Sequence, residues 1–373
     1  MTRLGVWWWD GFPVAEVEDR RGRAFLRYTA DARDRWPANA PVISCSLPLG
    51  PRWLDATAFL RGVLPEGRHL ERMAADAGLA VTDTVGLLAR YGRDVAGALV
   101  IAEEWPGDRP GEAVPYDAAS LAAEVADLGE RPLALHDDSE LSIAGIQDKL
   151  LLIADGAGGW ARPAGGAPST HILKADDLRR PGLIAAEAAC LQLAAHLGLA
   201  EGEVRLEEIG ETACLVVARF DRAPGEDGRV VRIHQEDVCQ ATGSDPAAAR
   251  GRGKYEDAGG PSLRQVAGLL DAHARDPLAE LDRLVAAVTF TVLVGNADAH
   301  GKNLAFLHEG ADIRLAPLYD LVPTVLWRNL RRAPAMLIGP RWTTIDRIEV
   351  DDIVAEASSW PHDAGRARRI VHE

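Results

Sequence analysis

The 373-residue chain is 47% hydrophobic and 26% charged, a balance that is typical of folded proteins and excludes an intrinsically disordered chain. Its length exceeds that of one ordinary domain and favours two domains or one large two-lobed unit. The formal net charge of -15 argues against a broad intrinsic affinity for nucleic acid phosphate.

The chain start and the cysteines indicate the compartment. The opening residues, MTRLGVWWWDG, lack a basic region followed by a long apolar segment, so we expect no signal peptide. The four cysteines are far apart and form no CxxC pair, so disulfides and a structural zinc site are not expected. The apolar stretch 284–294 is too short to span a bilayer. We therefore expect a cytoplasmic protein with no membrane partner.

The first hundred residues predict a small mixed domain. Residues 4–28 indicate two or three strands, broken at Asp10-Gly11 and at the charged stretch 18–23. A further strand is expected over 41–49. Residues 55–79 carry apolar side chains at helical spacing, and the pattern ends on Gly78. The stretch 102–117 is rich in Pro, Gly and acidic residues, and we interpret it as a boundary.

From about residue 132 the pattern changes to longer apolar segments. We expect a strand, a turn and a strand over 141–155, a flexible loop over 156–170, and strands over 171–176 and 211–222. A helix is predicted over 182–199. The rest is expected to be mostly helical, apart from its opening stretch and a short strand pair around 314–318. A strand-rich half followed by a helical half predicts an α+β fold of two lobes with a cleft between them.

One segment, TVLVGNADAHGKNLAFL (291–307), places several polar side chains directly after an apolar run that we expect in the core. They are Asn296, Asp298, His300, Lys302 and Asn303. Asp298 and Asn303 have the D-x-x-x-x-N spacing of the catalytic base and the metal-binding amide in protein kinases. Such a carboxylate accepts a hydroxyl proton, while the amide oxygen holds magnesium. By itself the spacing favours an ordinary capped turn, by roughly two to one.

Other parts of a phosphoryl-transfer site occur in a suitable order. Lys174 ends the strand HILK, where a phosphate-binding lysine belongs, and Glu187 lies on the following helix as its candidate partner. Asp320 follows a strand in LAPLYDLVPT and supplies a second carboxylate for magnesium. SIAGIQDK, which contains Lys149, offers a small-residue turn but no G-x-G-x-x-G loop. A strand-end lysine usually just reaches solvent, so the order of the parts carries the kinase-like interpretation.

The motifs resemble those of a known family, the HipA-type serine/threonine kinases, which are the toxins of bacterial HipBA toxin–antitoxin systems. The kinase part is similar in SIAGIQDKLLL, HILKAD, EAACLQLAAHLGL, ARFDR, RIHQEDVCQATG, KYEDAGGPS, LVGNADAHGKNLAFL and LAPLYDLVPT. GFPVAEV, SLPL, LPEG and YGRDVAGAL resemble the amino-terminal subdomain. The resemblance covers about residues 5–355 and is most specific over 234–320.

The resemblance implies a two-lobed protein-kinase-like fold of the PI3/4-kinase-related branch, with a small mixed N-terminal lobe and a mostly helical C-terminal lobe. It places the amino-terminal subdomain at residues 1–105 and the kinase domain with its ATP cleft at 135–355. Residues 356–373 form a helical end, which relatives continue for another helix or two.

Residue roles follow from the resemblance, motif by motif. Asp298 is implied as the catalytic base, Asn303 and Asp320 as magnesium ligands, and Ser142 as the autophosphorylated residue. Lys302 suits a γ-phosphate, whereas His300 is expected to be structural. The positions implied to contact ATP are Ala144, Gly145, Ile146, Gln147, Asp148 and Lys149 in the phosphate loop, Lys174, the hinge residues Ala218, Arg219 and Phe220, and His300, Gly301, Lys302 and Asn303 in the catalytic loop. Two positions depart from the family, Ala218 in place of a hinge glutamate and Ala186 in place of an asparagine.

The implied function is an ATP- and magnesium-dependent serine/threonine protein kinase toxin. Its expected protein substrate is a translation factor such as an aminoacyl-tRNA synthetase, and its expected partner is a HipB-like helix-turn-helix antitoxin that carries it to DNA as a corepressor. Two alternatives stand beside it, a catalytically idle corepressor subunit and a small-molecule phosphotransferase of the aminoglycoside kinase type. The presence of Lys174, Asp298, Asn303 and Asp320 favours an enzyme. IHQEDVCQATG and KYEDAGGPS favour the HipA type.

Overall fold

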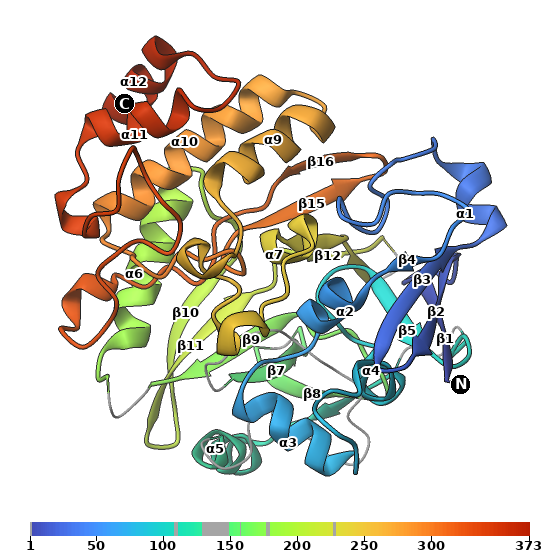
Figure 1. The fold of residues 1–373 in the computed structure, drawn as a ribbon. Helices are drawn as coiled ribbons and strands as arrows, with labels where there is room; N and C mark the ends of the chain where they lie inside the picture. Colours follow the sequence, from blue (N-terminus) through green and yellow to red (C-terminus); the bar gives the residue numbers. More distant parts are fainter. Residues whose placement is uncertain (1, 108–110, 129–148, 157, 177–179, 227–228) are drawn as a thin grey trace. The chain divides into compact units, whose positions relative to one another are not determined.

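The structure, a computed structural model, describes residues 2–107, 111–128, 149–156, 158–176, 180–226 and 229–373 (Figure 1). The chain divides into two compact units, each made of segments that are separated in the sequence. The first contains Met1–Asn39, Leu47–Ile184 and Gly202–His234, and the second contains Ala40–Ser46, Ala185–Glu201 and Gln235–Glu373. The fold is mixed, with helices and several sheets. None of the helices in the described ranges combines the length and hydrophobicity that a bilayer-spanning helix requires.

The first unit begins with an antiparallel sheet in the order β4-β3-β2-β1-β5. Its opening strands confirm the prediction of strands over 4–28, and Leu4 and Val6 are buried in the alternating pattern of a strand that packs on one face. The strands are β1 (Arg3–Trp8), β2 (Pro13–Arg20), β3 (Arg23–Tyr28), β4 (Leu54–Asp55) and β5 (Leu99–Ala102). The helices beside them are α1 (Ala30–Arg35), α2 (Thr57–Val63), α3 (Arg68–Asp76) and α4 (Thr84–Tyr91).

Two predictions for this region are wrong. Residues 41–49 do not form a strand, because their backbone donors bond to side chains. The Cys45 N–H donates to Glu236 Oε1 (2.8 Å) and the Ser46 N–H to Ser44 Oγ (3.1 Å). The helical pattern over 55–79 is split into α2 and α3, because Pro65 holds the preceding Leu64 in an extended conformation with ψ of 156°.

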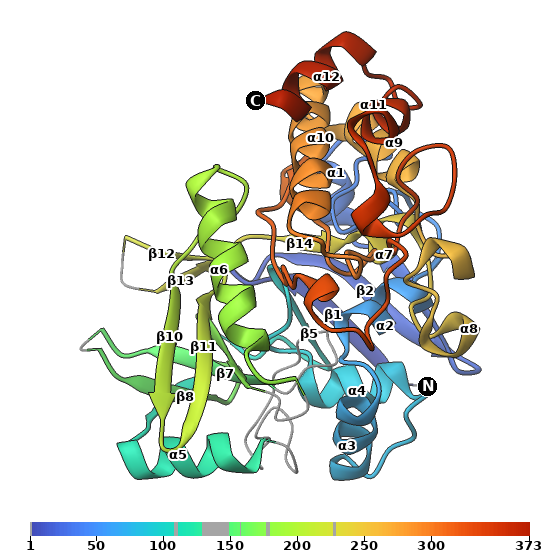
Figure 2. The same ribbon diagram turned by 90° about the vertical axis from the view of Figure 1, so that its left-hand side faces the viewer.

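A second antiparallel sheet of the first unit has the order β10-β11-β9-β7-β8-β6. Figure 2 shows α5 (Ala118–Asp127) lying against the lower end of this sheet, and Leu121 and Val125 join its hydrophobic core. Its strands are β6 (Glu112–Pro115), β7 (Lys149–Ala154), β8 (Trp160–Ala164), β9 (His171–Ala175), β10 (Val204–Ile209) and β11 (Thr212–Ala218). A separate hairpin pairs β12 (Arg222–Pro224) with β13 (Val230–Arg232). The predicted loop over 156–170 is therefore wrong at β8, where Trp160 is buried in the core despite the surrounding glycines and prolines.

A network of buried charges connects the two sheets of the first unit. Asp221 accepts hydrogen bonds from Arg219 Nε (2.9 Å), Arg219 Nη2 (2.8 Å) and Arg222 Nη1 (2.8 Å). Arg222 Nη2 also donates to Asp94 Oδ1 (2.9 Å), and Ser169 Oγ donates to Asp94 Oδ2 (2.6 Å). Arg232 contributes a further guanidinium 3.5 Å from Asp94. All four ionised side chains of the central pairs are at most 3% exposed. The buried hydrogen bonds and ion pairs of the ARFDR motif therefore connect the segment that follows α4 with the end of β11.

The second unit is mainly helical, and Figure 1 shows α9, α10, α11 and α12 gathered at its upper end. Its helices are α6 (Leu183–His196, from Ala185 on), α7 (Val238–Thr242), α8 (Ala248–Gly251), α9 (Leu263–His273), α10 (Pro277–Leu293), α11 (Val350–Ala357) and α12 (Ala364–His372). A small sheet has the order β14-β15-β16, with β14 (Gln235–Asp237), β15 (Ala305–Glu309) and β16 (Asp312–Leu315). The predicted helix over 182–199 is confirmed by α6, and Gly198 follows it with φ of 72°.

Two expectations for the second unit need correction. Residues 316–349 contain only short 3-10 turns, η3 (Thr324–Leu326) and η4 (Ile345–Arg347), rather than longer helices. The apolar run 291–294 is not a core element, because it continues the last turn of α10 and Leu293 is 78% exposed. A helix buries one face, so α10 packs through Leu284 and Val288 instead.

Candidate active site

The predicted catalytic loop starts where α10 ends, in the second unit. Gly295 makes the turn with φ of 70°, and a Cβ at this position would lie 2.4 Å from the Val325 side chain. The Asn296 N–H donates to the carbonyl of Thr291 (3.0 Å), and the Ala297 N–H donates to Thr324 Oγ1 (2.9 Å). The helix end and the η3 turn therefore fix the direction in which the loop leaves the helix.

Hydrogen bonds within the loop converge on the backbone of Asp298. Its N–H donates to Asn296 Oδ1 (3.0 Å). Its carbonyl accepts from the His300 N–H (2.8 Å) and from Asn303 Nδ2 (3.1 Å). The Asn303 N–H donates to the carbonyl of His300 (2.8 Å). The D-x-x-x-x-N spacing is therefore a closed turn whose backbone geometry is independent of the Asp298 carboxylate.

The carboxylate of Asp298 is oriented by a tyrosine. Tyr255 donates its hydroxyl to Asp298 Oδ1 at 2.7 Å. The Tyr255 ring meets the His300 ring edge to face, with centroids 5.2 Å apart, and the Arg331 guanidinium lies 5.1 Å from its centroid. His300 packs against the Tyr255 ring, and its expected structural role stays a prediction. One carboxylate oxygen of Asp298, Oδ1, is therefore held by Tyr255, and the role of Asp298 as the base stays a prediction.

The next residues of the loop are buried and tightly packed. Lys302 Nζ lies 3.0 Å from Asp237 Oδ2, and the Lys302 side chain is 4% exposed. Asp237 also caps α7, since its Oδ1 accepts from the Gln240 N–H (2.9 Å). A Cβ on Gly301 would lie 2.4 Å from Pro261, so packing accounts for the glycine here. The proposed contact of Lys302 with a γ-phosphate stays a prediction, and Asp237 is its partner in this structure.

Two residues suit a magnesium ion. The Nδ2 of Asn303 donates a hydrogen bond within the loop, so the Oδ1 of the same amide points away from that bond. An amide oxygen is a ligand that a hard cation prefers. Asp320 has a φ of 56°, a conformation that is strained for aspartate, and the neighbouring Tyr319 donates its hydroxyl to the Lys302 carbonyl (2.7 Å). No group of three or more His, Cys, Asp or Glu side chains that could hold a metal exists among the described residues. Asn303 and Asp320 supply an amide and a carboxylate, which are oxygen donors of the kind that magnesium binds, and their role as its ligands stays a prediction.

The first unit presents two lysines side by side. Lys149 of β7 and Lys174 of β9 are directly paired across the antiparallel strands, so both side chains lie on one face of the sheet. Their residues are 7% and 9% exposed. The predicted contacts of Lys149 and Lys174 with ATP stay predictions. Glu187, the expected carboxylate partner of Lys174, is fully buried on α6 in the second unit.

The predicted hinge uses some of its backbone donors internally. The Ala218 N–H donates to the Glu203 carbonyl and the Arg219 N–H to the Thr170 carbonyl, both at 2.9 Å. The side chain of Arg219 belongs to the buried charge network. Adenine recognition by Ala218–Phe220 therefore stays a prediction that rests on the remaining backbone groups. Ser142 and Ala144, Gly145, Ile146, Gln147 and Asp148 of the predicted phosphate loop lie outside the described residues.

The sequence interpretation gave no role to Tyr255, Asp237 or Asn296, although all three lie in the quoted motifs. Asn296 is adjacent to the catalytic loop and was noted with it. Tyr255 and Asp237 are 43 and 65 residues from their partners Asp298 and Lys302. The only sequence signal for them was their position in KYEDAGGPS and IHQEDVCQATG.

The models of the HipA N-terminal domain and the HipA-like C-terminal domain match residues 4–102 and 141–373. The chain is 37% identical over 351 residues to Y4mE of Sinorhizobium fredii, whose name describes a candidate kinase, with 90% of this chain and 81% of that protein covered. It is 30% identical over 324 residues to the serine/threonine-protein kinase toxin HipA of Shewanella oneidensis, with 84% and 73% covered.

The solved structure of the Shewanella oneidensis HipA, HipB and operator DNA complex contains a chain with the same fold. The TM-score is 0.81 at 27% identity, and the alignment covers 99% of this chain and 87% of that chain. Both domain models therefore match in the order that the motifs predicted, and the alignments extend over most of the sequence. The chain belongs to the HipA family.

Proposed function

We propose that this protein is an ATP-dependent serine/threonine protein kinase that acts as the toxin of a toxin–antitoxin pair. The observation that carries the proposal is the Asp298 carboxylate, held through one oxygen by Tyr255 at the head of a closed D-x-x-x-x-N turn. Family membership supports the reaction class. An idle corepressor subunit is less well supported, because Lys174, Asp298, Asn303 and Asp320 are all present.

In the proposed reaction the hydroxyl oxygen of a substrate serine bonds to the γ-phosphorus of ATP, and Asp298 accepts the hydroxyl proton. The bond from the γ-phosphorus to the β,γ-bridging oxygen breaks, and ADP leaves. Tyr255 fixes the orientation of the carboxylate, and the backbone bonds of the loop fix its position. Lys174 and Lys149 hold phosphate oxygens. Asn303 and Asp320 would hold magnesium, which would supply positive charge against the phosphates. The substrate proposed from the family resemblance is a translation factor such as an aminoacyl-tRNA synthetase.

A radiolabelled-ATP assay tests the reaction class. Purified protein with magnesium is offered aminoacyl-tRNA synthetases as protein acceptors and, separately, aminoglycosides. We expect label in protein and none in the small molecules. Label in aminoglycosides alone would replace the protein kinase with a small-molecule phosphotransferase, and no label in any acceptor or in the chain itself would favour the idle corepressor.

We further propose that a HipB-like helix-turn-helix antitoxin carries the chain to DNA. The Shewanella oneidensis relative was solved together with HipB and operator DNA, and a chain of net charge -15 is poorly suited to bind phosphate backbones alone. In a gel-shift assay at physiological salt, the isolated chain should not retard duplex DNA. Tight, salt-sensitive retardation by the chain alone would contradict the antitoxin's role as the DNA-binding partner.

Replacement of Lys174 by alanine tests the phosphate contact. Loss of a charge-assisted hydrogen bond costs about 1.5–3 kcal/mol, so ATP affinity or turnover should fall about 10- to 150-fold. Binding is measured with a fluorescent ATP analogue and turnover with labelled ATP. Arg205→Ala removes an exposed cation of the same sheet and serves as the control. Unchanged binding together with unchanged turnover would remove Lys174 from the site.

Tyr255→Phe tests the orientation of the base. The variant keeps the ring against His300 and Arg331 but removes the hydroxyl that donates to Asp298. A hydrogen bond to a charged group contributes about 1.5–3 kcal/mol, so kcat should fall at least tenfold with little change in the KM for ATP. Tyr255→Leu, which also removes the ring, should be worse. A rise in KM at constant kcat would make Tyr255 a binding residue instead of a positioning residue.

A further inference from the structure

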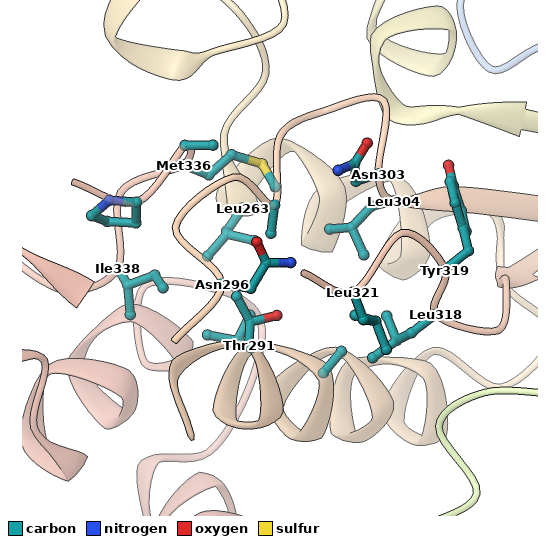
Figure 3. Close-up of a pocket in the computed structure, with 15 residues that line it drawn as sticks. Leu263, Thr291, Asn296, Asn303, Leu304, Leu318, Tyr319, Leu321, Met336 and Ile338 are labelled. Atoms are coloured by element: carbon teal, nitrogen blue, oxygen red, sulfur yellow. The ribbon is translucent and has the colours of Figure 1, made fainter. Parts of the chain in front are cut away.

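A small cavity lies beside the catalytic loop, within the second unit (Figure 3). Its volume is about 30 Å³, and its walls come from α9, α10, the loop and residues 318–321 and 334–338. Most of the lining is apolar, including Val288, Leu321 and Met336. A cavity of this size has room for roughly two water-sized groups.

The cavity and the candidate base lie on different faces of the loop. Asn296, Ala299 and Asn303 line the cavity. Asp298 instead directs its carboxylate to Tyr255, and Lys302 directs its ammonium to Asp237. Asp298 and Lys302, with Tyr255 and Asp237 that their side chains contact, are absent from the lining. Asn296, Asn303 and Tyr319, which bond to the loop backbone, are part of it. The cavity therefore lies apart from the Asp298 carboxylate, but it shares Asn303 with the proposed magnesium site.

One polar group inside the cavity is unsatisfied. Asn296 is 2% exposed, and its Nδ2 has no hydrogen-bond partner within the described part of the chain. The orientation of this amide is fixed, because the Asp298 N–H needs an acceptor and faces Asn296 Oδ1 at 3.0 Å. Figure 3 shows the Asn296 nitrogen directed among the lining side chains. A buried donor without an acceptor is unfavourable, so this amide favours a ligand that supplies one.

We propose that this cavity is a binding site for an uncharged molecule of about two or three non-hydrogen atoms with one hydrogen-bond acceptor, such as methanol or ethanol. The single donor of Asn296 selects one acceptor atom. The apolar walls favour a hydrocarbon remainder and exclude an ion, which would lose its hydration there. The same Asn296 side chain holds the Asp298 backbone, so occupancy acts directly on the segment that carries the candidate base. Binding itself does not depend on the kinase proposal.

Ethanol is a suitable probe, and methionine methyl groups give a readout apart from activity. The chain has three methionines. Met336 lines the cavity, whereas Met73 is buried in the first unit and reports non-specific solvent effects. In full-length protein with ¹³C-labelled methionine methyls and ¹⁵N-labelled asparagine, ethanol should shift the Met336 methyl and the Asn296 side-chain amide signals saturably. Met73 and the exposed Asn329 should show linear shifts at most.

Variants separate the donor from the apolar walls. Asn296→Asp keeps an oxygen for the Asp298 N–H and removes the donor, so the saturable Met336 shift should disappear. Thr291→Val, in the same lining, keeps the donor and should retain it. Val288→Leu fills the cavity from α10 and leaves the loop sequence unchanged. This variant should abolish the saturable Met336 shift, and it provides the test if Asn296→Asp fails to fold. Three results would each overturn the proposal. The Met336 signal could shift only linearly with ethanol, or its saturable shift could survive in Asn296→Asp or Val288→Leu. A resident water at the Asn296 amide could also remain in place when ethanol is added.

Discussion

Asp298→Asn should lower phosphoryl transfer by about two to four orders of magnitude while leaving the fold and ATP binding intact. The structure explains both parts of this expectation. The bonds that shape the loop use the backbone N–H and carbonyl of Asp298, which the substitution does not change. The asparagine oxygen can still accept from the Tyr255 hydroxyl. What is lost is a carboxylate that can take the proton of the incoming serine.

The measurement pairs single-turnover transfer from labelled ATP with circular dichroism and nucleotide titration of the same samples. Asp351→Asn on α11 is a matched control, because it makes the same change at an exposed carboxylate paired with Arg368 (2.6 Å). It should leave transfer unchanged. Wild-type transfer rates in Asp298→Asn would show that NADAHGKN is a structural turn.

Asp221→Ala should cause the largest loss of stability. Asp221 accepts hydrogen bonds from Arg219, Arg222 and the Gly97 N–H (2.7 Å). Removal of one partner from a buried pair leaves uncompensated charge, and such changes cost about 3–5 kcal/mol. Urea unfolding, followed by circular dichroism, should show a lower midpoint. Glu203→Ala removes an exposed carboxylate 2.6 Å from Arg205 and should leave the midpoint unchanged. Equal midpoints for Asp221→Ala and wild type would mean that the network contributes no net stability.

The same network predicts the pH dependence of unfolding. Burial alone would raise the pKa of Asp94 and of Asp221, but the guanidinium groups of Arg219 and Arg222, with Arg232 at Asp94, outweigh it and both pKa values are lowered. A carboxyl group with a lowered folded-state pKa contributes stability above its unfolded pKa of about 3.9 and loses it as the pH falls through the folded value. Wild-type stability should therefore decline below about pH 4, and the decline should be shallower in Asp221→Ala.

Local patterns predicted the elements that depend on local physics. Alternation placed β1 to β3, helical spacing with a glycine stop placed α6, and apolar runs placed β9 and β11. The wrong secondary-structure predictions were at segments whose conformation depends on contacts with residues that are distant in the sequence. Residues 41–49 look like a strand until side chains such as Glu236, far away in the sequence, take their backbone donors.

The candidate site shows the same division between local and distant information. The D-x-x-x-x-N turn is local, and the structure joins Asp298 and Asn303 in one closed turn, while their roles as base and magnesium ligand stay predictions. Tyr255 and Asp237 could not be assigned, because their roles arise from the contact of three distant segments in the fold. The unsatisfied side-chain amide of Asn296 could not be predicted either, because residue spacing does not determine the burial or the direction of a side chain.

Mass spectrometry of the chain after incubation with Mg-ATP tests the kinase proposal most directly, because it needs neither the substrate nor the antitoxin. From the family resemblance we propose that Ser142 is the autophosphorylated residue and that its modification switches the kinase off. Wild-type protein should gain one phosphate, located at Ser142 by peptide sequencing, and Asp298→Asn should gain none under the same conditions. A phosphate at Ser142 in the Asp298→Asn variant, at the wild-type level, would contradict the assignment of Asp298 as the base on which the reaction depends.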